Sequence, residues 1–222
     1  KRTWRALLDA GHDLGNHTES HPHGEKLLVA DWEKEMRACA DSLSAPFDPQ
    51  ESLPFPDAGK GVGVDKAQII GFRTPFLEYN DATFIAASKV GFTYDCSIEE
   101  GLQGDQDGTD FLWPYTLDNG SPGHDLLVSW QMKTPIAPQP GLMEMPVYAV
   151  IAPPDELCEK YGVEKGLRDR LKTRQDYLET ENGKITGFDY NLWALFQMTG
   201  AEVLATLKYT FDQRLSGNRA PL

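Results

Sequence analysis

The chain has 222 residues, of which 40% are hydrophobic and 25% are charged, and its formal net charge is -13. This composition is typical of a globular protein with a sizeable core. The acidic balance argues against a nucleic acid as partner, because proteins that bind nucleic acids carry a basic face. We expect no membrane span, because no run of about 18 apolar residues is present. Three cysteines are too few and too scattered for a disulfide scaffold.

The first elements that the sequence predicts are helices. The stretch 2–10 resembles the last turns of a helix that ends at Gly11, because glycine is preferred just after a helix C-terminus. A second, amphipathic helix is predicted over 27–44. Its apolar residues recur at helical spacing: Trp32, Met36, Cys39 and Leu43. The stretch 45–63 is rich in Pro, Gly and Asp and is predicted to be a loop.

Short apolar runs and helical patterns alternate in the middle of the chain. Asp81 can cap a helix that runs to Val90, and Gly91 can close it. The apolar run 67–72 predicts a buried strand. Further strands are predicted over 92–98, 125–130 and 142–150.

The last third of the chain is more charged. Residues 152–186 have a largely helical pattern, and the segment 199–202 is a capping box that opens a final helix. Val203, Leu207 and Phe211 are predicted to face inward in this helix. Because strands alternate with helices throughout, we expect an α/β fold with a parallel sheet, of which a barrel is one form.

The most informative segment is 11–21, which contains His17 and His21 four residues apart. Neutral imidazole is the commonest protein ligand for zinc and similar metals. Residues four apart in a helical turn lie side by side, with about 5–6 Å between Cβ atoms, so the two rings can hold one ion. The alternative is a solvated polar turn. Asn16 also begins a glycosylation sequon, but it overlaps the metal site and we expect no glycan there.

A second group of residues follows the run 67–72. Arg73 stands at the end of that predicted strand, where α/β folds build their sites; the alternative is an arginine paired with a surface acid. Pro75 fixes the backbone. The next amide, that of Phe76, is therefore held in a defined direction and could donate to an oxyanion.

Aromatic residues gather in a third segment, 111–118. Phe111, Trp113 and Tyr115 lie close to Pro114 and could wall a sugar-binding groove. Aromatics at this density are also ordinary in a core, and their spacing leaves both interpretations open.

The order of these segments resembles that of the polysaccharide deacetylase family (carbohydrate esterase family 4, the NodB-homology domain), especially its chitin deacetylase-like branch. The similar segments, in chain order, are GHDLGNHTESHPH, GFRTPFLEYN, VGFTYDCSI, LWPYTLDNG, GLMEMPV and SGNRAPL. Together they spread over most of the chain. The histidine motif and the RTPF motif are specific in combination.

The resemblance implies a distorted (β/α) barrel with one divalent metal ion, usually zinc, bound by one aspartate and two histidines. His17 and His21 match those two histidines, and Thr18 matches a residue that steadies their loop. The implied reaction is deacetylation of an N-acetylated polysaccharide, chitin-like or peptidoglycan-like, with release of acetate. The implied partner is this acetylated glycan, and the implied location is extracytoplasmic: secreted, periplasmic or at the cell surface.

The resemblance also assigns roles to the other segments. Arg73 matches an arginine that orients the catalytic aspartate, and Phe76, after Pro75, stands where a backbone amide binds the oxyanion. Trp113 matches an aromatic that walls the site, and Tyr115 lies beside it as a second substrate-binding residue.

Two motifs of the family are missing. The TFDD-type motif would supply the general base and the aspartate ligand, and the LHxH-type motif would supply the general-acid histidine. None of the other three histidines (His12, His23 and His124) is placed to replace the latter; we interpret them as solvated or as local hydrogen-bond formers. We therefore expect a single catalytic domain over 1–222 that is incomplete at both ends, an internal segment of a longer protein, inactive by itself.

Two other classes of function remain open from the sequence. One is a non-catalytic, carbohydrate-binding relative with the same fold. The other is an unrelated metal-dependent hydrolase on an α/β scaffold. The sequence fixes neither the glycan, nor the metal, nor the oligomeric state.

Overall fold

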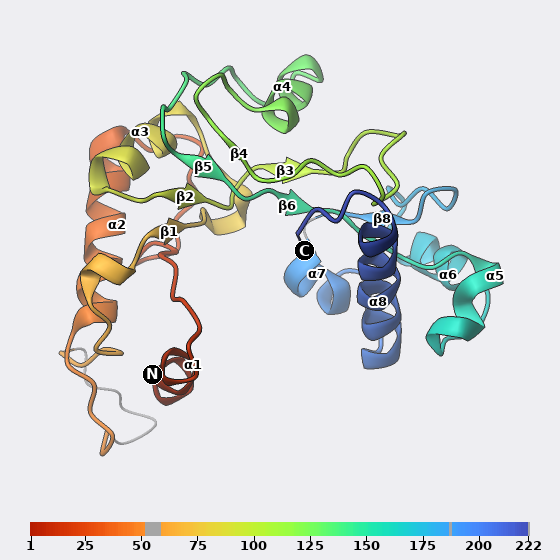
Figure 1. The fold of residues 1–222 in the computed structure, drawn as a ribbon, viewed down its shortest axis with the longest axis horizontal. Coiled ribbons are helices and arrows are strands. Elements are labelled where there is room, and N and C mark those ends of the chain that lie inside the picture. The colour runs from red at the N-terminus through yellow and green to blue at the C-terminus, as the bar shows by residue number, and fades with distance from the viewer. Residues whose placement is uncertain (52–58, 187, 222) are drawn as a thin grey trace. The chain divides into compact units, whose positions relative to one another are not determined.

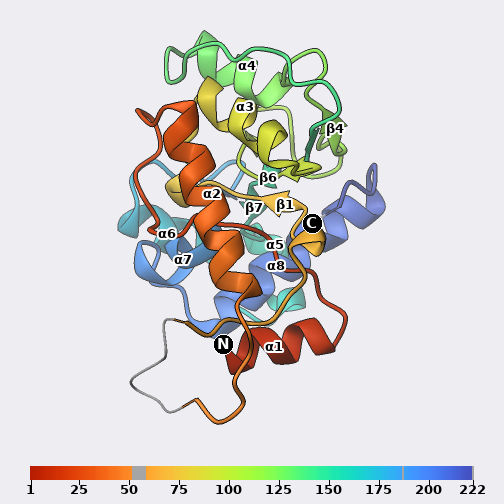
Figure 2. The ribbon, with the colours of Figure 1, turned by 90° about the vertical axis from the view of Figure 1, so that its left-hand side faces the viewer.

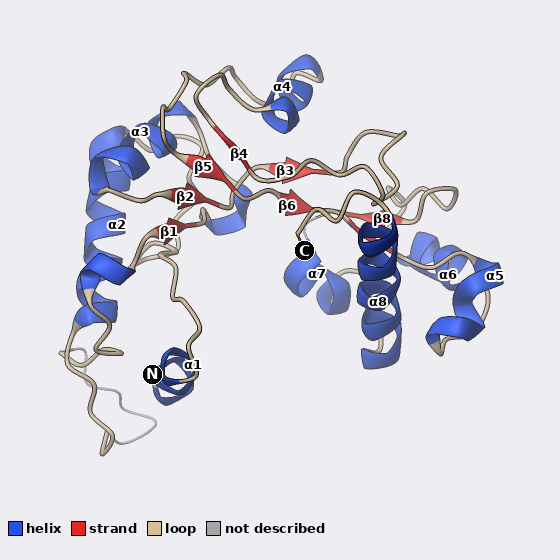
Figure 3. Cartoon of the chain, viewed as in Figure 1, coloured by secondary structure: helices blue, strands red, loops and turns tan. Residues whose placement is uncertain are grey.

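The computed structural model describes residues 1–51, 59–186 and 188–221 (Figure 1). This described part is a mixed α/β structure with eight α-helices and several very short strands, joined by long loops (Figure 3). It divides into two compact units. Unit 1 comprises Lys1–Ile98 and Tyr115–Met145, and unit 2 comprises Glu99–Pro114 and Pro146–Leu222. The part of the predicted loop 45–63 that falls on 52–58 lies outside the described residues.

Unit 1 is built on a four-stranded sheet with the order β1-β2-β5-β4 (Figure 1). The strands are β1 (Gly71–Phe72), β2 (Tyr94–Asp95), β4 (Tyr115–Thr116) and β5 (Met143–Glu144). The first three in spatial order are parallel, and β4 is antiparallel to β5. Asn16 forms a single parallel bridge with Phe72, which adds one rung beyond β1. The α/β class is therefore confirmed in its general form. No closed barrel is found in the described part of the chain.

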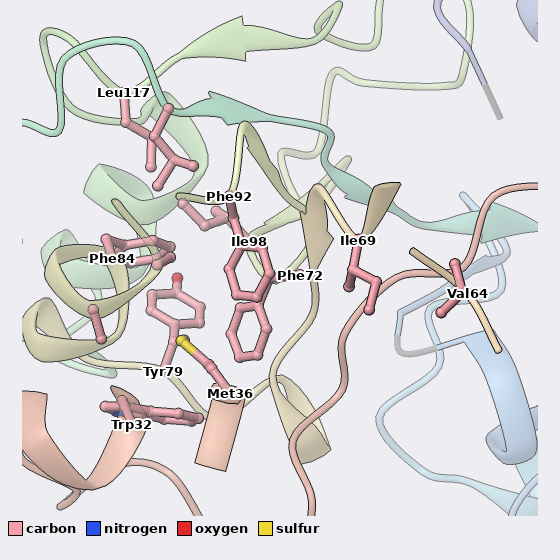
Figure 4. Packing of buried hydrophobic residues seen from close by; sticks show 13 residues of the cluster. Trp32, Met36, Val64, Ile69, Phe72, Tyr79, Phe84, Phe92, Ile98 and Leu117 are labelled. Carbon is pink, nitrogen blue, oxygen red and sulfur yellow. The ribbon is translucent and has the colours of Figure 1, made fainter. Parts of the chain in front are cut away.

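The helices of unit 1 supply its core. They are α1 (Arg2–Asp9), α2 (Val29–Ser44), α3 (Asp81–Val90) and α4 (Pro122–Ser129), with the 3₁₀ turns η1 (Lys66–Gln68) and η2 (Pro75–Leu77). Helices α2 and α3 lie side by side (Figure 2). Trp32 and Met36 on α2 and Phe84 on α3 are fully buried with Phe72 of β1 (Figure 4). Burial of one such side chain contributes roughly 1.5–3 kcal/mol.

The sequence predicted the first three helices of unit 1 well. The amphipathic helix expected over 27–44 is α2, and the helix expected from Asp81 to Val90 is α3. Its cap is Asn80 rather than Asp81, because the Asn80 side chain accepts a hydrogen bond from the Thr83 amide. Gly91 ends the helix at φ +100°, in the left-handed region that favours glycine.

The strand predicted over 125–130 is wrong, because this segment belongs to α4. Ser121 caps that helix by accepting a hydrogen bond from the amide of His124, and Pro122 occupies its first turn. Both are helix-start signals. A short apolar run has no period that separates a strand from a helix, so the cap should have decided the prediction.

Other predicted strands are present but much shorter. Of the run 67–72, only β1 is a strand, because the Asp65 side chain caps η1 over Ala67 and Gln68. Of 92–98, only β2 is a strand. The run 142–150 is divided into β5, β6 (Val147–Tyr148) and the start of β7 (Val150–Ile151). Pro146 stands between β5 and β6, where it lacks the amide that a ladder would need.

Unit 2 contains two small two-stranded sheets. In one, β3 (Glu99–Glu100) pairs in parallel with β6; in the other, β7 is antiparallel to β8 (Lys184–Ile185). Its helices are α5 (Asp155–Cys158), α6 (Leu167–Arg174), α7 (Phe188–Ala194) and α8 (Gly200–Ser216), with the 3₁₀ turn η3 (Glu159–Tyr161). The largely helical pattern predicted over 152–186 is thus confirmed for α5 and α6 but not for β8. Over the ranges that the structure describes, no helix is long and apolar enough to cross a membrane.

The capping box before α8 is confirmed. The predicted inward face of that helix is confirmed for Val203 and Leu207, which pack against the core of unit 2, and is wrong for Phe211. Thr199 and Glu202 cap each other's backbone amides as expected. Phe211 is 52% exposed, however, while Thr210 and Arg214 are buried. Polar partners explain the difference: the Thr210 hydroxyl accepts a hydrogen bond from the Ile151 amide, and Arg214 donates to a carbonyl and lies over an aromatic ring.

The packing of Gly24 gives a prediction about stability. A Cβ atom at this position would lie 2.3 Å from the carbonyl oxygen of Glu78 and 2.5 Å from the ring of Trp32. Both neighbours are fixed, one as backbone and one as a fully buried side chain. We expect Gly24→Ala to lower the free energy of unfolding by about 1–3 kcal/mol, measured by urea denaturation.

Gly15→Ala is the matched control in the same unit. Its added Cβ would meet only the Gly71 carbonyl, at an ordinary 3.5 Å. Equal stability of the two variants would contradict the packing described around Gly24.

Candidate functional site

The histidine and RTPF segments singled out in the sequence meet at one edge of the sheet in unit 1. Three parallel segments, Asn16, β1 and β2, are hydrogen bonded side by side. The residues that follow them are His17, Arg73 and Cys96. Because the carboxyl ends of parallel strands meet at the same edge, the loops that carry these three residues start next to one another. The prediction that Arg73 stands at a strand end is confirmed.

The buried side chain of Asn16 holds the loop that carries the histidines. This side chain is only 1% exposed, its amide group donates to the carbonyl of Met36 at 2.7 Å, and its oxygen accepts from the amide of Thr18 at 3.1 Å. The hydroxyl of Thr18 then accepts from the amide of His21 at 3.2 Å. Thr18 was expected to steady the histidine loop, and its hydrogen bond with the His21 amide is a contact that can do so.

The two histidine rings lie close together, edge to face, at the exposed surface of this edge. The ring centroids of His17 and His21 are 5.0 Å apart, and the ring planes make an angle of 70°. Nδ1 of His17 lies 2.9 Å from the carbonyl oxygen of Arg73. Because a carbonyl oxygen only accepts, Nδ1 is the donor in this contact. A backbone carbonyl on the other ring nitrogen is the usual support of a metal-binding histidine.

The described residues supply at most a pair of candidate ligands rather than a whole metal site. Over residues 1–51, 59–186 and 188–221, no group of three or more His, Cys, Asp or Glu side chains could hold a metal ion. Catalytic zinc sites normally use three protein ligands. The donor chemistry of His17 and His21 fits such a site as two of its three ligands.

The loop after β1 is tied to the end of β2. Nε of Arg73 donates to the carbonyl of Cys96 at 2.9 Å, and the amide of Thr74 donates to the hydroxyl of Ser97 at 2.9 Å. The following residue, Pro75, is buried. Arg73 is therefore oriented by the neighbouring strand rather than being held only by a surface acid.

Phe76 is half exposed in a strained turn. Its φ is +57° and that of Leu77 is +55°. Among the described residues, seven other than glycine have positive φ, and four of them lie in the two loops of this site: Thr18, His21, Phe76 and Leu77. Such strain costs about 1–3 kcal/mol for each residue and concentrates at functional sites. The turn uses the amides of Leu77 and Glu78 for its own hydrogen bonds, not the amide of Phe76.

His23 and Glu78 belong to this cluster, and the sequence analysis assigned neither of them to the site. The ring of Phe76 meets the ring of His21 edge-on, with centroids 4.6 Å apart, and stacks on the ring of His23 at 4.4 Å. Nδ1 of His23 lies 3.0 Å from both carboxylate oxygens of Glu78. His23 is thus a local hydrogen-bond former, as expected, but it also packs against the site. The signal in the sequence was its position two residues after His21.

Two buried acids lie near the same edge, and the sequence analysis assigned neither of them to the site. Asp95 on β2 and Glu144 on β5 are fully buried. Burial raises the pKa of Asp95 to about 6, although hydrogen bonds from Glu144 and Ser97 and the charge of Arg73 act in the opposite direction. Burial, together with the charge of Asp95, raises the pKa of Glu144 well above its usual range. A carboxyl group inside a predicted buried strand was the signal that could have revealed them.

The aromatic residues predicted to bind sugar fall into different units. Tyr115 belongs to unit 1, where it packs against the core and its hydroxyl lies 2.6 Å from that of Ser121. Trp113 belongs to unit 2, is 56% exposed, and donates from its indole nitrogen to the carbonyl of Asn218. Phe111 is fully buried and stacks on Tyr148, so it is a core residue of unit 2.

The remaining histidines differ in their surroundings. His12 is exposed. His124 is buried, so of the two expected alternatives it is the local hydrogen-bond former rather than the solvated residue. Its Nδ1 lies 3.1 Å from the hydroxyl of Tyr79, and its Nε2 lies 3.0 Å from the carbonyl of Thr134. Burial lowers the pKa of His124. Its two hydrogen-bond contacts make it a local structural residue.

Comparison with known proteins gives no further guide to the site. No protein-family model matches the chain, and no curated protein matches it significantly.

The anchoring by Asn16 gives a second prediction. Asn16→Ala removes the hydrogen bonds to Met36 and Thr18 inside a buried environment. We expect the free energy of unfolding to fall by about 1–3 kcal/mol, measured by urea denaturation. Asn119→Ala is the control: Asn119 is exposed, and we expect a change of less than about 0.5 kcal/mol. A stable Asn16→Ala variant would show that the loop does not depend on this side chain.

Proposed function

We propose that this chain is part of a metal-dependent polysaccharide deacetylase, a hydrolase that removes acetyl groups from an N-acetylated glycan and releases acetate. One observation carries the proposal. The segments that resemble the family's histidine and RTPF motifs lie next to each other at one sheet edge, with the two histidine rings 5.0 Å apart and Phe76 against His21. Their meeting at the carboxyl ends of parallel strands, where α/β folds build their sites, supports the proposal.

His17 and His21 are the residues that would hold the divalent ion, which we propose to be zinc. With the donor at Nδ1, the neutral ring of His17 has an unprotonated Nε2, the form that binds a metal. A bound divalent ion supplies a Lewis acid for the acetyl carbonyl and a water whose pKa is lowered toward about 7. The third ligand, the general base and the general acid are assigned by the resemblance to motifs outside these 222 residues.

The other residues have roles in orientation. The amide of Phe76 follows buried Pro75 and is not used by the turn, so it is a candidate donor to the oxyanion; one such donor is typically worth about 2.7–4 kcal/mol. Arg73 is held by the Cys96 carbonyl through Nε. Its role is to orient the carboxylate that serves as base. Trp113 and Tyr115 are proposed to contact the glycan.

The finer fold and the location follow from the same proposal. Three strands of the unit 1 sheet are parallel and have α2 and α3 in the same unit, a combination that also occurs in (β/α) barrels. We propose a barrel for the catalytic domain and an extracytoplasmic location, where glycans of this kind occur.

Zinc binding by the histidine pair is a testable consequence. His17→Ala and His21→Ala should each lower the affinity for Zn²⁺ by more than about tenfold, because each variant removes one ligand. The measurement is isothermal titration of the metal-free chain with zinc. His12→Ala is the control, since His12 is exposed in the same segment. Equal affinities in all three variants would exclude the pair as ligands.

Acetate release tests the activity itself. The substrate is a chitin oligosaccharide, and the protein is assayed both as the 222-residue chain and with its encoded flanking sequence. We expect activity only in the longer form. In that form Arg73→Lys should lower kcat by about 10²-fold, because lysine lacks the planar fork that orients a carboxylate.

Arg37→Lys is the control for this substitution, because Arg37 is exposed on α2 and pairs with Glu33. Oligosaccharide binding without acetate release would favour a carbohydrate-binding relative. Hydrolysis of phosphate esters or peptides without acetate release would favour an unrelated hydrolase. Full activity in Arg73→Lys would remove Arg73 from the site.

A further inference from the structure

The buried acids Asp95 and Glu144 form a pair with a defined geometry. They are register partners on the neighbouring parallel strands β2 and β5, so their side chains lie on the same face of the sheet. Both are 0% exposed, and Oε2 of Glu144 is buried without a hydrogen-bond partner among the described residues. A hydrogen bond between this oxygen and the Asp95 carboxyl would need a proton on one of the two groups.

The pair is connected to the loop of Arg73 through Ser97. The Asp95 carboxylate accepts from the amide of Ser97 at 2.7 Å and from its hydroxyl at 2.9 Å. The same hydroxyl oxygen accepts from the amide of Thr74 at 2.9 Å. Glu144 accepts from the amide of Ile98 at 3.1 Å. The acid pair thus fixes the backbone after β2, and Ser97 passes that constraint to the residue after Arg73.

The surroundings of the pair favour one negative charge over two. The neighbouring groups that titrate or carry charge are Arg73 from the end of β1, the Cys96 thiol, and Tyr115, which is the register partner of Glu144 on β4. Arg73 is the positive charge that acts on Asp95. Two carboxylates in one buried site repel each other, so the second ionisation is opposed.

We propose that Asp95 and Glu144 share a single proton, and that this shared proton is what holds the loop at Arg73 and Thr74 in place. On deprotonation the pair gives its proton to solvent and becomes two buried carboxylates, which separate and release Ser97 from Thr74. Both acids are positioning residues. The consequence for catalysis rests on the proposed function, but the consequence for the loop does not.

The direction of the pH effect follows from the two shifted groups. Each acid has a folded-state pKa above its unfolded value, 3.8 for Asp95 and 4.5 for Glu144. The neutral forms therefore stabilise the fold. This contribution is complete below about pH 4 and is lost as the pH rises, for Asp95 up to about 6 and for Glu144 above that.

Glu144→Gln tests the shared proton. A glutamine has the shape of glutamic acid, can donate an N–H to Asp95 where the proton stood, and still accepts from Ile98. We expect the melting temperature of the unaltered chain to fall as the pH rises above about 6, and that fall to be largely absent in Glu144→Gln. Glu25→Gln removes an exposed acid of the same unit and should keep the fall. A Glu144→Gln profile parallel to that of the unaltered chain overturns the proposal.

Hydrogen exchange tests the link to the loop. In the unaltered chain, the protection factor of the Thr74 amide should drop by about tenfold over the same pH range, the equivalent of one ordinary hydrogen bond. The amide of Cys96, bonded to the carbonyl of Phe72, is the reference and should keep its protection. Constant protection of Thr74 overturns the proposal.

Ser97→Ala keeps the proposal falsifiable if Glu144→Gln does not fold. This variant leaves the acids in place but removes the hydroxyl that accepts from Thr74. We expect Thr74 to be unprotected at every pH, while the melting temperature still falls with pH. Retained protection of Thr74 overturns the link. None of these measurements uses metal or glycan, so their failure is distinct from a failure of the proposed function.

Discussion

The parallel pairing of Asn16, β1 and β2 is the constraint on which the rest of unit 1 depends. The amide of Asn16 donates to Gly71, the amide of Arg73 donates back to Asn16, and Cys96 donates to Phe72. These few rungs set the register of three segments that are far apart in the chain. The loops that carry the two histidines and Arg73 leave the sheet together because of this register.

Polar side chains inside the unit turn this register into a rigid arrangement. Asn16 ties the histidine loop to helix α2, and Ser97 ties the loop after β1 to the end of β2. The strain in the loops is tolerated because these buried bonds, together with the core around Trp32, over-determine the backbone. The exposed rings of His17, His21 and Phe76 then need little further ordering.

The sequence predicted those elements that have strong local signals. Helix α3 has a cap and a terminal glycine, α2 has a continuous apolar period, and the capping box of α8 is local by nature. The strands were predicted to be longer than they are, because a two-residue strand is defined by its pairing partners and not by its own residues. Part of the buried face of α8 was missed for a similar reason: Thr210 and Arg214 are buried because distant groups satisfy them.

The residues of the candidate site also differ in whether local sequence or tertiary contacts reveal them. The spacing of His17 and His21 and the position of Arg73 after an apolar run could be predicted from local sequence. The contributions of Glu78, Asp95 and Glu144 could not, because each acts through a contact across the sheet or between loops. Whether an acid in an apolar strand has a partner is a question about tertiary structure.

The burial of Asn16 has a consequence for how the chain can be produced. Asn16, His17 and Thr18 form a sequon, and a glycan is added to the side-chain nitrogen of such an asparagine. In the folded chain that nitrogen donates to the carbonyl of Met36 and is shielded from solvent. A sugar attached there before folding would have no space and would block the pairing of Asn16 with α2. A host without asparagine-linked glycosylation is therefore the suitable source of correctly folded material.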